Sequence, residues 1–350
     1  MTGTMLAAVF RDIEQMDIEE RPIPDCPAGG LLVRVAACGI CGGDVRNFHN
    51  GLKGGVKNQI MGHEIAGEVV ETGGTRFSVG ERVALAPDVS CGECYYCRRG
   101  LVNLCLSHKM LGTHYPGGFA QYIALPREIL QRGFVETIPA GMSNQHAAFA
   151  ETAAAVIACQ QRNQVSLGDS VVIIGDGPVG CLHIETARAR GASKIFMLGR
   201  GRLELAKAFE PDLLLDNADT EAVTAEVLAK TNGIGADIVI CAVPVAAVQQ
   251  QAVEMVRKRG TVVIYGGVPK SRETTKLNSN LIHYNEITVT GAFSYPATGL
   301  SDALDAIHNQ KIHTEKYIHA CVALPDIADG MKLVETGAAM KVMVEPWKEV

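Results

Sequence analysis

The stretch that decides the fold is Val-Val-Ile-Ile-Gly-Asp-Gly-Pro-Val-Gly at residues 171–180. Its apolar half, 171–174, predicts a buried strand, and a helix is predicted to follow over 178–190. The glycines between them form G-x-G-x-x-G, which permits a tight turn, close approach to a pyrophosphate and close packing of helix on strand. The helix N-terminus also favours negative charge. In this context the motif predicts dinucleotide binding by Gly175, Gly177, Pro178, Val179 and Gly180.

The alternation of strand and helix continues on both sides of this motif from about residue 152. Strands are predicted at 195–198, 213–215, 238–241, 261–265 and 287–290, and helices near 221–230 and 245–258. Strands that alternate with helices imply right-handed crossovers. This part of the chain is therefore predicted to form a doubly wound parallel α/β sheet.

Residues 5–150 have a different texture, with short β-type runs separated by Gly and Pro turns. The predicted strands here are 31–36, 65–71, 82–86 and 119–124, each rich in Val, Ile or aromatic residues. The tail adds a helix over 300–310 and a final strand over 341–344, short elements that can pack back onto the first half. A chain of 350 residues with these two textures is expected to form about two domains.

The second α/β strand ends in Gly199-Arg200-Gly201-Arg202. An NAD-specific site normally has Asp or Glu there to hold the ribose 2′-hydroxyl, and none is present. Gly199 leaves space where a carboxylate would repel a 2′-phosphate, and Arg200 and Arg202 can pair with that phosphate. The residues therefore favour NADP over NAD, the alternative being a solvated turn whose arginines contact no ligand. Asp176 suits a pyrophosphate site only if its side chain points away.

Composition and charge exclude several classes of protein. Hydrophobic residues make up 47% of the chain and charged residues 20%, as in ordinary folded proteins. The net charge is −6 and no basic run occurs, so neither nucleic acid nor a membrane surface is an expected partner. The sequence contains no apolar run long enough for a membrane helix and no signal-peptide pattern. We expect a soluble, cytoplasmic protein that acts on a small molecule.

Four of the eleven cysteines lie in one loop with the spacing Cys91-x2-Cys94-x2-Cys97-x7-Cys105. Four thiolates have the number and softness that a closed tetrahedral zinc site requires. The residues that flank them are polar, so a core made of reduced cysteines is a poor alternative. We predict a structural zinc ion that stabilises this loop and has no open position for chemistry.

A second, looser set combines Cys41 with His63 and Glu64. Cysteine, histidine and carboxylate from separate segments suit the three-ligand, open site of a catalytic zinc ion. A single histidine beside a glutamate is, however, also common as a solvated or hydrogen-bonded pair. Composition also leaves open whether Cys38 or Cys41 would be the ligand.

Together these motifs resemble the zinc-dependent medium-chain dehydrogenase/reductase family, and most closely its sorbitol (L-iditol 2-) dehydrogenase-like branch. The resemblance runs through almost the whole chain, at 39–44, 62–64, the four-cysteine loop, 117–122, 175–180, 266–270 and 280–291. It implies a GroES-like, mostly β catalytic domain formed by 1–152 and 293–350, and a Rossmann domain over 153–292. It also implies a homodimer or homotetramer.

The resemblance assigns roles to individual residues. The candidate ligands of a catalytic zinc ion are Cys41, His63 and Glu64. Cys38 is then a structural neighbour, and Glu151 matches an acidic residue that binds zinc directly or through water. Asp44 matches the carboxylate that orients the histidine ligand. Two zinc ions per chain, one catalytic and one structural, are implied.

Two positions depart from the family pattern. The family usually has Ser or Thr after Cys-Gly to pass the alcohol proton outward, whereas this chain has Gly43. Many members have His where this chain has Arg46. The usual proton relay is therefore missing, and Glu64, Glu151 or a water chain would have to move the proton. Arg46 is a candidate for holding a phosphate or carboxylate of the substrate, and Phe119 is a second candidate substrate contact.

The sequence thus predicts a zinc-dependent dehydrogenase that transfers hydride reversibly between NADP(H) and a secondary alcohol of a polyol, sugar or cyclitol. Zinc would act as a Lewis acid on the substrate oxygen, and the nicotinamide would carry the hydride. One alternative is a dehydrogenase for threonine-type amino alcohols or simple secondary alcohols. Another, prompted by Gly43 and Arg46, is a catalytically silent NADP(H)-binding protein.

Overall fold

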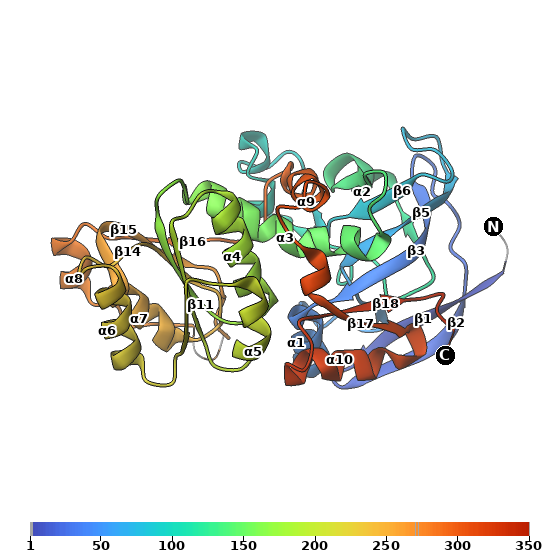
Figure 1. Ribbon diagram of the computed structural model, residues 1–350. Helices are drawn as coiled ribbons and strands as arrows, with labels where there is room; N and C mark the ends of the chain where they lie inside the picture. Colours follow the sequence, from blue (N-terminus) through green and yellow to red (C-terminus); the bar gives the residue numbers. More distant parts are fainter. Residues whose placement is uncertain (1–2, 270, 272, 350) are drawn as a thin grey trace. The chain divides into compact units, whose positions relative to one another are not determined.

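The computed structural model describes residues 3–269, 271 and 273–349, so Lys270 of the 266–270 motif lies outside the described residues. The chain divides into two compact units (Figure 1). Unit 1 consists of Met1–Ala154 and Tyr295–Val350, and unit 2 of Ala155–Ser294. Each unit has its own sheets and helices and is described by itself.

Unit 2 contains a sheet in which every described pair of neighbouring strands is parallel. The strand order is β13-β12-β11-β14-β15-β16, the doubly wound order of a Rossmann domain. Their bounds are β11 Ser170–Ile174, β12 Lys194–Gly199, β13 Leu213–Asp216, β14 Ala236–Cys241, β15 Val256–Ile264 and β16 Thr288–Gly291. All five residues of β11 are buried, as expected for a central parallel strand that is covered on both faces. The predicted parallel α/β sheet is confirmed.

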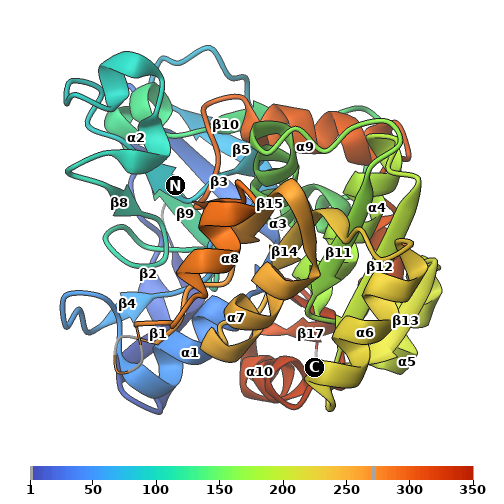
Figure 2. The same ribbon diagram turned by 90° about the vertical axis from the view of Figure 1, so that its left-hand side faces the viewer.

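Helices cover both faces of this sheet. Figures 1 and 2 show α4 (Pro178–Ala189) and α5 (Leu203–Ala206) on one side, and α6 (Thr220–Lys230) and α7 (Ala246–Met255) on the other. A further helix, α8 (Ser279–Tyr284), contacts α7. The helix predicted over 245–258 is too long, because Val256 already pairs with Ala236 of β14 and begins strand β15.

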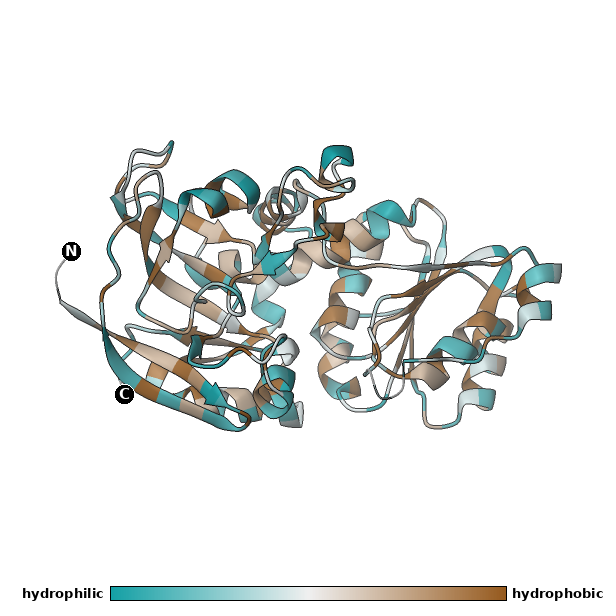
Figure 3. Cartoon of the chain, turned by 180° about the vertical axis from the view of Figure 1, so that it is seen from behind, coloured by the Kyte–Doolittle hydropathy of each residue, from teal (hydrophilic) through white to brown (hydrophobic). Residues whose placement is uncertain are grey.

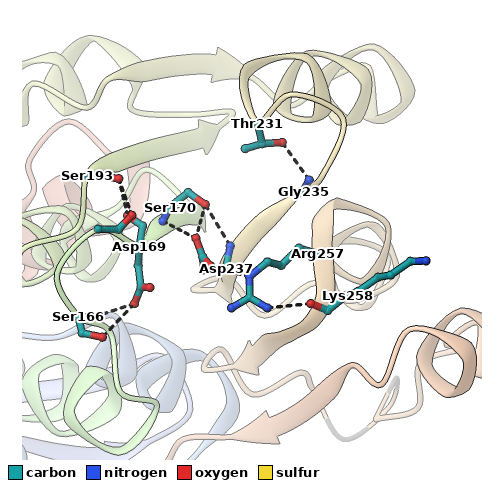
Figure 4. A network of polar contacts seen from close by, with 10 residues as sticks. Ser166, Asp169, Ser170, Ser193, Thr231, Gly235, Asp237, Arg257 and Lys258 are labelled. Atoms are coloured by element: carbon teal, nitrogen blue, oxygen red, sulfur yellow. Dashed lines mark hydrogen bonds and ion pairs between the residues drawn. The ribbon is translucent and has the colours of Figure 1, made fainter.

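A polar network fixes the amino ends of the central strands of unit 2 (Figure 4). The backbone N–H and the hydroxyl of Ser170 donate to Asp237 Oδ2 at 2.8 and 2.7 Å. Arg257 Nε donates to Asp237 Oδ1 at 2.6 Å. Burial would raise the pKa of Asp237, but the Ser170 and Arg257 donors outweigh it and the pKa is lowered. These bonds fix β11, β14 and β15 against one another and leave the carboxyl ends of the strands for a ligand.

Unit 1 is built mostly of strands. Its largest sheet has the order β10-β6-β5-β3-β18-β17, and β9 also pairs with β3. The bounds are β3 Leu31–Ile40, β5 Glu64–Thr72, β6 Arg82–Leu85, β9 Tyr122–Leu125, β10 Val135–Thr137, β17 Ile318–Ala323 and β18 Lys341–Glu345. Two smaller sheets contain β1 Thr4–Asp12, β2 Gln15–Pro22 and β4 Gln59–Ile60, and β7 Asp88–Val89 with β8 Lys109–Met110. Since β18 pairs with β3, the predicted packing of the tail onto the first half is confirmed.

Helices border these sheets. They are α1 Gly42–Asn50, α2 Arg127–Arg132, α3 Asn144–Arg162, α9 Gly299–His308 and α10 Ile327–Thr336, of which α3 begins in unit 1 and ends in unit 2. Of these helices, sequence analysis predicted α9 and missed α1, α2, α3 and α10. The signal for α3 was its run of alanines, which favour a helix even without a one-sided apolar pattern.

The central strands of each unit are rich in hydrophobic residues, whereas many turns are polar (Figure 3). In unit 1 the core contains Val33, Ile65, Phe119 and Val342, which come from both segments of the chain. Among the described residues, no helix combines the length and hydropathy needed to cross a bilayer.

Candidate active site

The strand pairing of unit 1 brings the predicted zinc ligands together. Gly39 of β3 pairs with Glu64 of β5, so the end of β3 lies beside the start of β5. Cys41 follows β3 as the N-cap of α1, and His63 precedes β5. One donor atom each of Cys41, His63 and Glu64 lie within 4.8 Å of one another. A sulfur, an imidazole nitrogen and a carboxylate oxygen at this separation fit a three-ligand zinc site.

Asp44 organises two of these residues. Its Oδ2 accepts a hydrogen bond from the backbone N–H of Cys41 at 3.0 Å, and its Oδ1 lies 3.2 Å from His63 Nδ1. Burial opposes a charge on His63, but the Asp44 carboxylate outweighs burial and raises the pKa of the imidazole. With Nδ1 directed to Asp44, His63 keeps Nε2 for a metal ion.

Glu64 has two partners that sequence analysis did not identify. Lys341 Nζ donates to both carboxylate oxygens at 2.6 and 2.8 Å, and the Thr152 hydroxyl donates to Oε1 at 2.9 Å. The side chains of Lys341 and Glu64 are only 3% and 0% exposed. Burial would lower the pKa of Lys341, but the Glu64 carboxylate raises it. No local pattern marks Lys341, because only the pairing of β18 with β3 brings it to Glu64.

Glu151 lies on α3 and accepts a hydrogen bond from the Tyr295 hydroxyl at 3.2 Å. Burial raises the pKa of Glu151 to about 7, with the Glu64 carboxylate adding to the rise and His63 opposing it. Burial also raises the pKa of Tyr295, so this phenol stays protonated and can donate. Tyr295 is a third site residue that sequence analysis missed, after Lys341 and Thr152.

The structure distinguishes Cys38 from Cys41 as the candidate zinc ligand, a choice that composition left open. Cys38 is fully buried in the unit 1 core, and burial raises the pKa of its thiol, whereas Cys41 lies in the donor group. Phe119 is also fully buried, so its prediction as a substrate contact is wrong. The reason is packing: a Cβ on Gly62, which has a φ of +87°, would lie 2.7 Å from both the Phe119 ring and Cys38 Sγ.

The four predicted cysteines of the second set also converge, with sulfurs that all lie within 4.8 Å. The sulfur of Cys97 lies 3.9 Å from that of Cys91 and 3.5 Å from that of Cys94. Tetrahedral Zn–S bonds of about 2.3 Å would place sulfurs about 3.8 Å apart. Backbone N–H donors lower the pKa of Cys94 to about 6, whereas burial raises that of Cys105 to about 11. The set fits a closed zinc site.

The glycine loop of unit 2 has the geometry of a phosphate-binding turn. A Cβ on Gly180 would overlap the carbonyl oxygen of Gly175, so helix α4 packs directly on the loop. Gly177 is the N-cap of α4 and provides no side-chain cap, while Pro178 occupies the first turn. The first backbone N–H groups of α4 can therefore bind an anion.

Asp176 points away from the phosphate-binding side of this loop. Its Oδ2 accepts hydrogen bonds from the backbone N–H groups of Gly201 and Arg202 at 2.8 and 2.5 Å. A Cβ on Gly199 would lie 2.5 Å from the Asp176 carboxylate. The prediction that Gly199 leaves open space is therefore wrong, because Asp176 fills it. Arg202 Nη1 lies 3.4 Å from the place of a Cβ on Gly177, and Arg200 is exposed.

Known proteins match this chain along nearly its full length. The alcohol dehydrogenase GroES-like domain matches residues 27–133, and the zinc-binding dehydrogenase domain matches 178–309. Sorbitol dehydrogenase from Bacillus subtilis is 33% identical over 98% of this chain and 97% of that protein. The chain belongs to the zinc-dependent medium-chain dehydrogenases. Within this family it falls in the sorbitol dehydrogenase-like branch.

Two further relatives support this placement among the medium-chain dehydrogenases. Probable D-xylulose reductase A from Aspergillus clavatus is 31% identical, over 98% of this chain and 97% of that protein. The crystal structure of a zinc-binding dehydrogenase from Sinorhizobium meliloti 1021, bound to NADP, superposes with a TM-score of 0.89. It is 29% identical, and the match covers 98% of this chain and 100% of that one. As a member of this family, the chain is a zinc-dependent alcohol dehydrogenase with a nicotinamide cofactor.

Proposed function

We propose that this dehydrogenase oxidises a secondary alcohol of a polyol, sugar or cyclitol with NADP+, and reduces the corresponding ketone in reverse. The observation that carries the proposal is the convergence of Cys41, His63 and Glu64 in unit 1. The names of the relatives, sorbitol dehydrogenase and D-xylulose reductase, support a polyol as the substrate.

Each residue of the site has a task in this proposal. Cys41, His63 and Glu64 would hold a zinc ion, which supplies Lewis-acid polarisation of the substrate oxygen when bound. Asp44 fixes the ring of His63 and the backbone of Cys41 through its two oxygens. Lys341 balances the charge of Glu64 in a buried ion pair.

Glu151 is the proposed proton carrier. Gly43 and Arg46 lack the hydroxyl and imidazole of the usual relay, so another group must accept the alcohol proton. A general base is most effective when its pKa lies near the working pH, and burial raises the pKa of Glu151 to about 7. The Tyr295 hydroxyl orients this carboxylate through its hydrogen bond.

NADP is the proposed cofactor, supported by two features of unit 2. No acidic residue stands at 199–202, where an NAD-specific enzyme would hold the ribose 2′-hydroxyl. The Asp176 carboxylate lies nearby, where it accepts hydrogen bonds from two backbone N–H groups. Arg200 is exposed at the end of β12 and suits a 2′-phosphate. The NADP-bound relative supports the same choice.

The four-cysteine loop is proposed to hold a structural zinc ion, and the chain to assemble as a homodimer or homotetramer. Strand β16 supports the second proposal, because it is the edge of its sheet and exposed Phe293 follows it closely. Light scattering coupled to gel filtration tests the assembly, and a monomeric mass would contradict it.

The function is tested by an absorbance assay for nicotinamide reduction, with NADP+ and NAD+ side by side against polyols, cyclitols and threonine. Cys41→Ala and His63→Ala are expected to abolish turnover and to lower the zinc content from about two ions to about one per chain. Cys38→Ala is the matched control and should keep both ions. Unchanged activity of Cys41→Ala would refute the site, and turnover of threonine alone would refute the polyol.

A further inference from the structure

Arg46 on helix α1 lies beside the donor group of the candidate zinc site. A Cβ built on Gly43 would lie 3.6 Å from Cys41 Sγ and 3.9 Å from each of Arg46 Nη2 and His63 Cε1. The guanidinium group, the thiol and the imidazole therefore border the same small space. All three belong to unit 1, so this arrangement is internal to one compact part of the chain.

The glycine at position 43 is not required by packing. At Gly39 and Gly62 a Cβ would overlap Glu64 and would crowd Cys38 and Phe119, so only glycine fits. At Gly43 the nearest atoms are at ordinary van der Waals distance, and its φ lies outside the left-handed region. An alanine would fit there without strain. What the glycine does is leave room between Arg46 and the donor atoms of Cys41 and His63.

The guanidinium group of Arg46 has no charged partner within the described part of the chain. Its side chain forms no hydrogen bond or ion pair there, and only its backbone carbonyl accepts a bond, from Asn50. The carboxylates nearby have other partners: Asp44 has Cys41 and His63, Glu64 has Lys341, and Glu151 has Tyr295. Arg46 is thus an exposed cation at a site whose anions are already engaged.

We propose that Arg46 binds an anionic group of the alcohol substrate in the space that Gly43 leaves open. The substrate class is then a polyol that carries a carboxylate or a phosphate. A planar guanidinium group suits both, because it can donate two parallel hydrogen bonds to either anion. The inference deepens the proposed function and rests on it.

The test compares substrates that share a six-carbon polyol chain and differ in the group at one end. D-Sorbitol is the neutral parent, D-gluconate carries a carboxylate at one end, and D-sorbitol 6-phosphate carries a phosphate at the other. The wild-type enzyme is expected to show a kcat/KM at least tenfold higher for one of the two anions than for sorbitol. Which anion is preferred distinguishes the carboxylate from the phosphate.

Arg46→Met removes the charge at similar length, and Arg46→Lys keeps the charge but loses the two-pronged donor. Arg46→Met is expected to lower the anion-to-sorbitol ratio of kcat/KM about 10- to 100-fold, mainly through KM, and Arg46→Lys is expected to lower it less. Lys53→Met, an exposed lysine shortly after α1, is the matched control and should leave the ratio unchanged.

Calorimetric titration of the preferred anion into zinc-loaded protein without nicotinamide gives a readout that does not depend on turnover. Arg46→Met should weaken this binding as strongly as it raises KM. Sorbitol turnover with no preference for either anion would overturn the role of Arg46 while leaving the proposed function intact. If Arg46→Met raised the KM for NADP+ equally with every substrate, that would also overturn this role, because Arg46 would then contact the cofactor. Absence of all polyol turnover would instead refute the proposed function.

Discussion

Replacing Lys341 by methionine should destabilise unit 1 strongly, because it leaves the carboxylate of Glu64 buried without its cation. Nζ of Lys341 contacts both oxygens of Glu64 at 2.6 and 2.8 Å. Methionine fills most of the same volume, so the change removes the charge and the hydrogen bonds rather than the packing. The remaining donor to Glu64 among the described residues is the Thr152 hydroxyl.

The magnitude follows from the burial of the pair. Because the two side chains are 3% and 0% exposed, solvent screens neither charge. Removing one partner of a buried ion pair typically costs about 3–5 kcal/mol. For a folding unit of this size, each kcal/mol shifts the melting temperature by about 2–4 °C. Lys341→Met should therefore lower the melting temperature of unit 1 by about 6–20 °C.

The assay is differential scanning calorimetry in the Cys41→Ala background. This site is then expected to bind no zinc ion, so a metal cannot replace Lys341 as the partner of Glu64. Lys311→Met, an exposed lysine of the same unit, controls for the substitution itself and should shift the melting temperature by less than about 2 °C. Glu64→Gln and the double variant complete a thermodynamic cycle. The double variant is expected to be more stable than the sum of the two single changes by about 2 kcal/mol or more.

Equal shifts for Lys341→Met and Lys311→Met would refute the reasoning, since they would mean that the buried pair contributes no more than a surface charge. Additive effects of the two single variants would refute it independently, because they would show that Lys341 and Glu64 do not interact. Either result would also remove Lys341 from the proposed site.

The remaining predictions concern the other zinc set, the cofactor loop and a histidine on α1. Cys97→Ser should lower the zinc content by about one ion per chain and make the 91–105 loop sensitive to limited proteolysis. Asp176→Ala releases the backbone of Gly201 and Arg202, and should raise the KM for NADP+ about tenfold or more in initial-rate assays. The Glu14 carboxylate raises the pKa of His49 above its usual 6.5, so His49 stabilises the fold below that pH. This contribution should disappear as pH rises through the raised pKa, and His49→Gln should then melt like the wild type.

Each of these predictions has a matched control in the same unit. Cys26 lies outside the four-cysteine loop, so the Cys26→Ser variant should keep both zinc ions. Glu204→Ala, an exposed acid on α5, should leave the KM for NADP+ unchanged. His308→Gln, at an exposed position on α9, controls for the His-to-Gln substitution itself. A variant that behaves like its control contradicts the corresponding prediction.

Local patterns were sufficient where the chemistry lies in one short segment. The glycine loop at 175–180 and the four-cysteine loop at 91–105 could be located from residue types and spacing, because all of their parts are close in sequence. The parallel sheet of unit 2 followed from the alternation of strands with helices. Helix α3 was missed because its alanines carry no one-sided pattern, although their propensity favours a helix.

What the sequence by itself determined is therefore the family, the two kinds of domain and the residues that are candidates to hold zinc and a dinucleotide. Only the tertiary structure decided their partners. Lys341 reaches Glu64, and Tyr295 reaches Glu151, across more than a hundred residues of chain. Asp176 fills the space beside Gly199, and Phe119 is buried in the core. The physical reason is that strand register and close packing bring distant segments together, and no local spacing encodes those contacts.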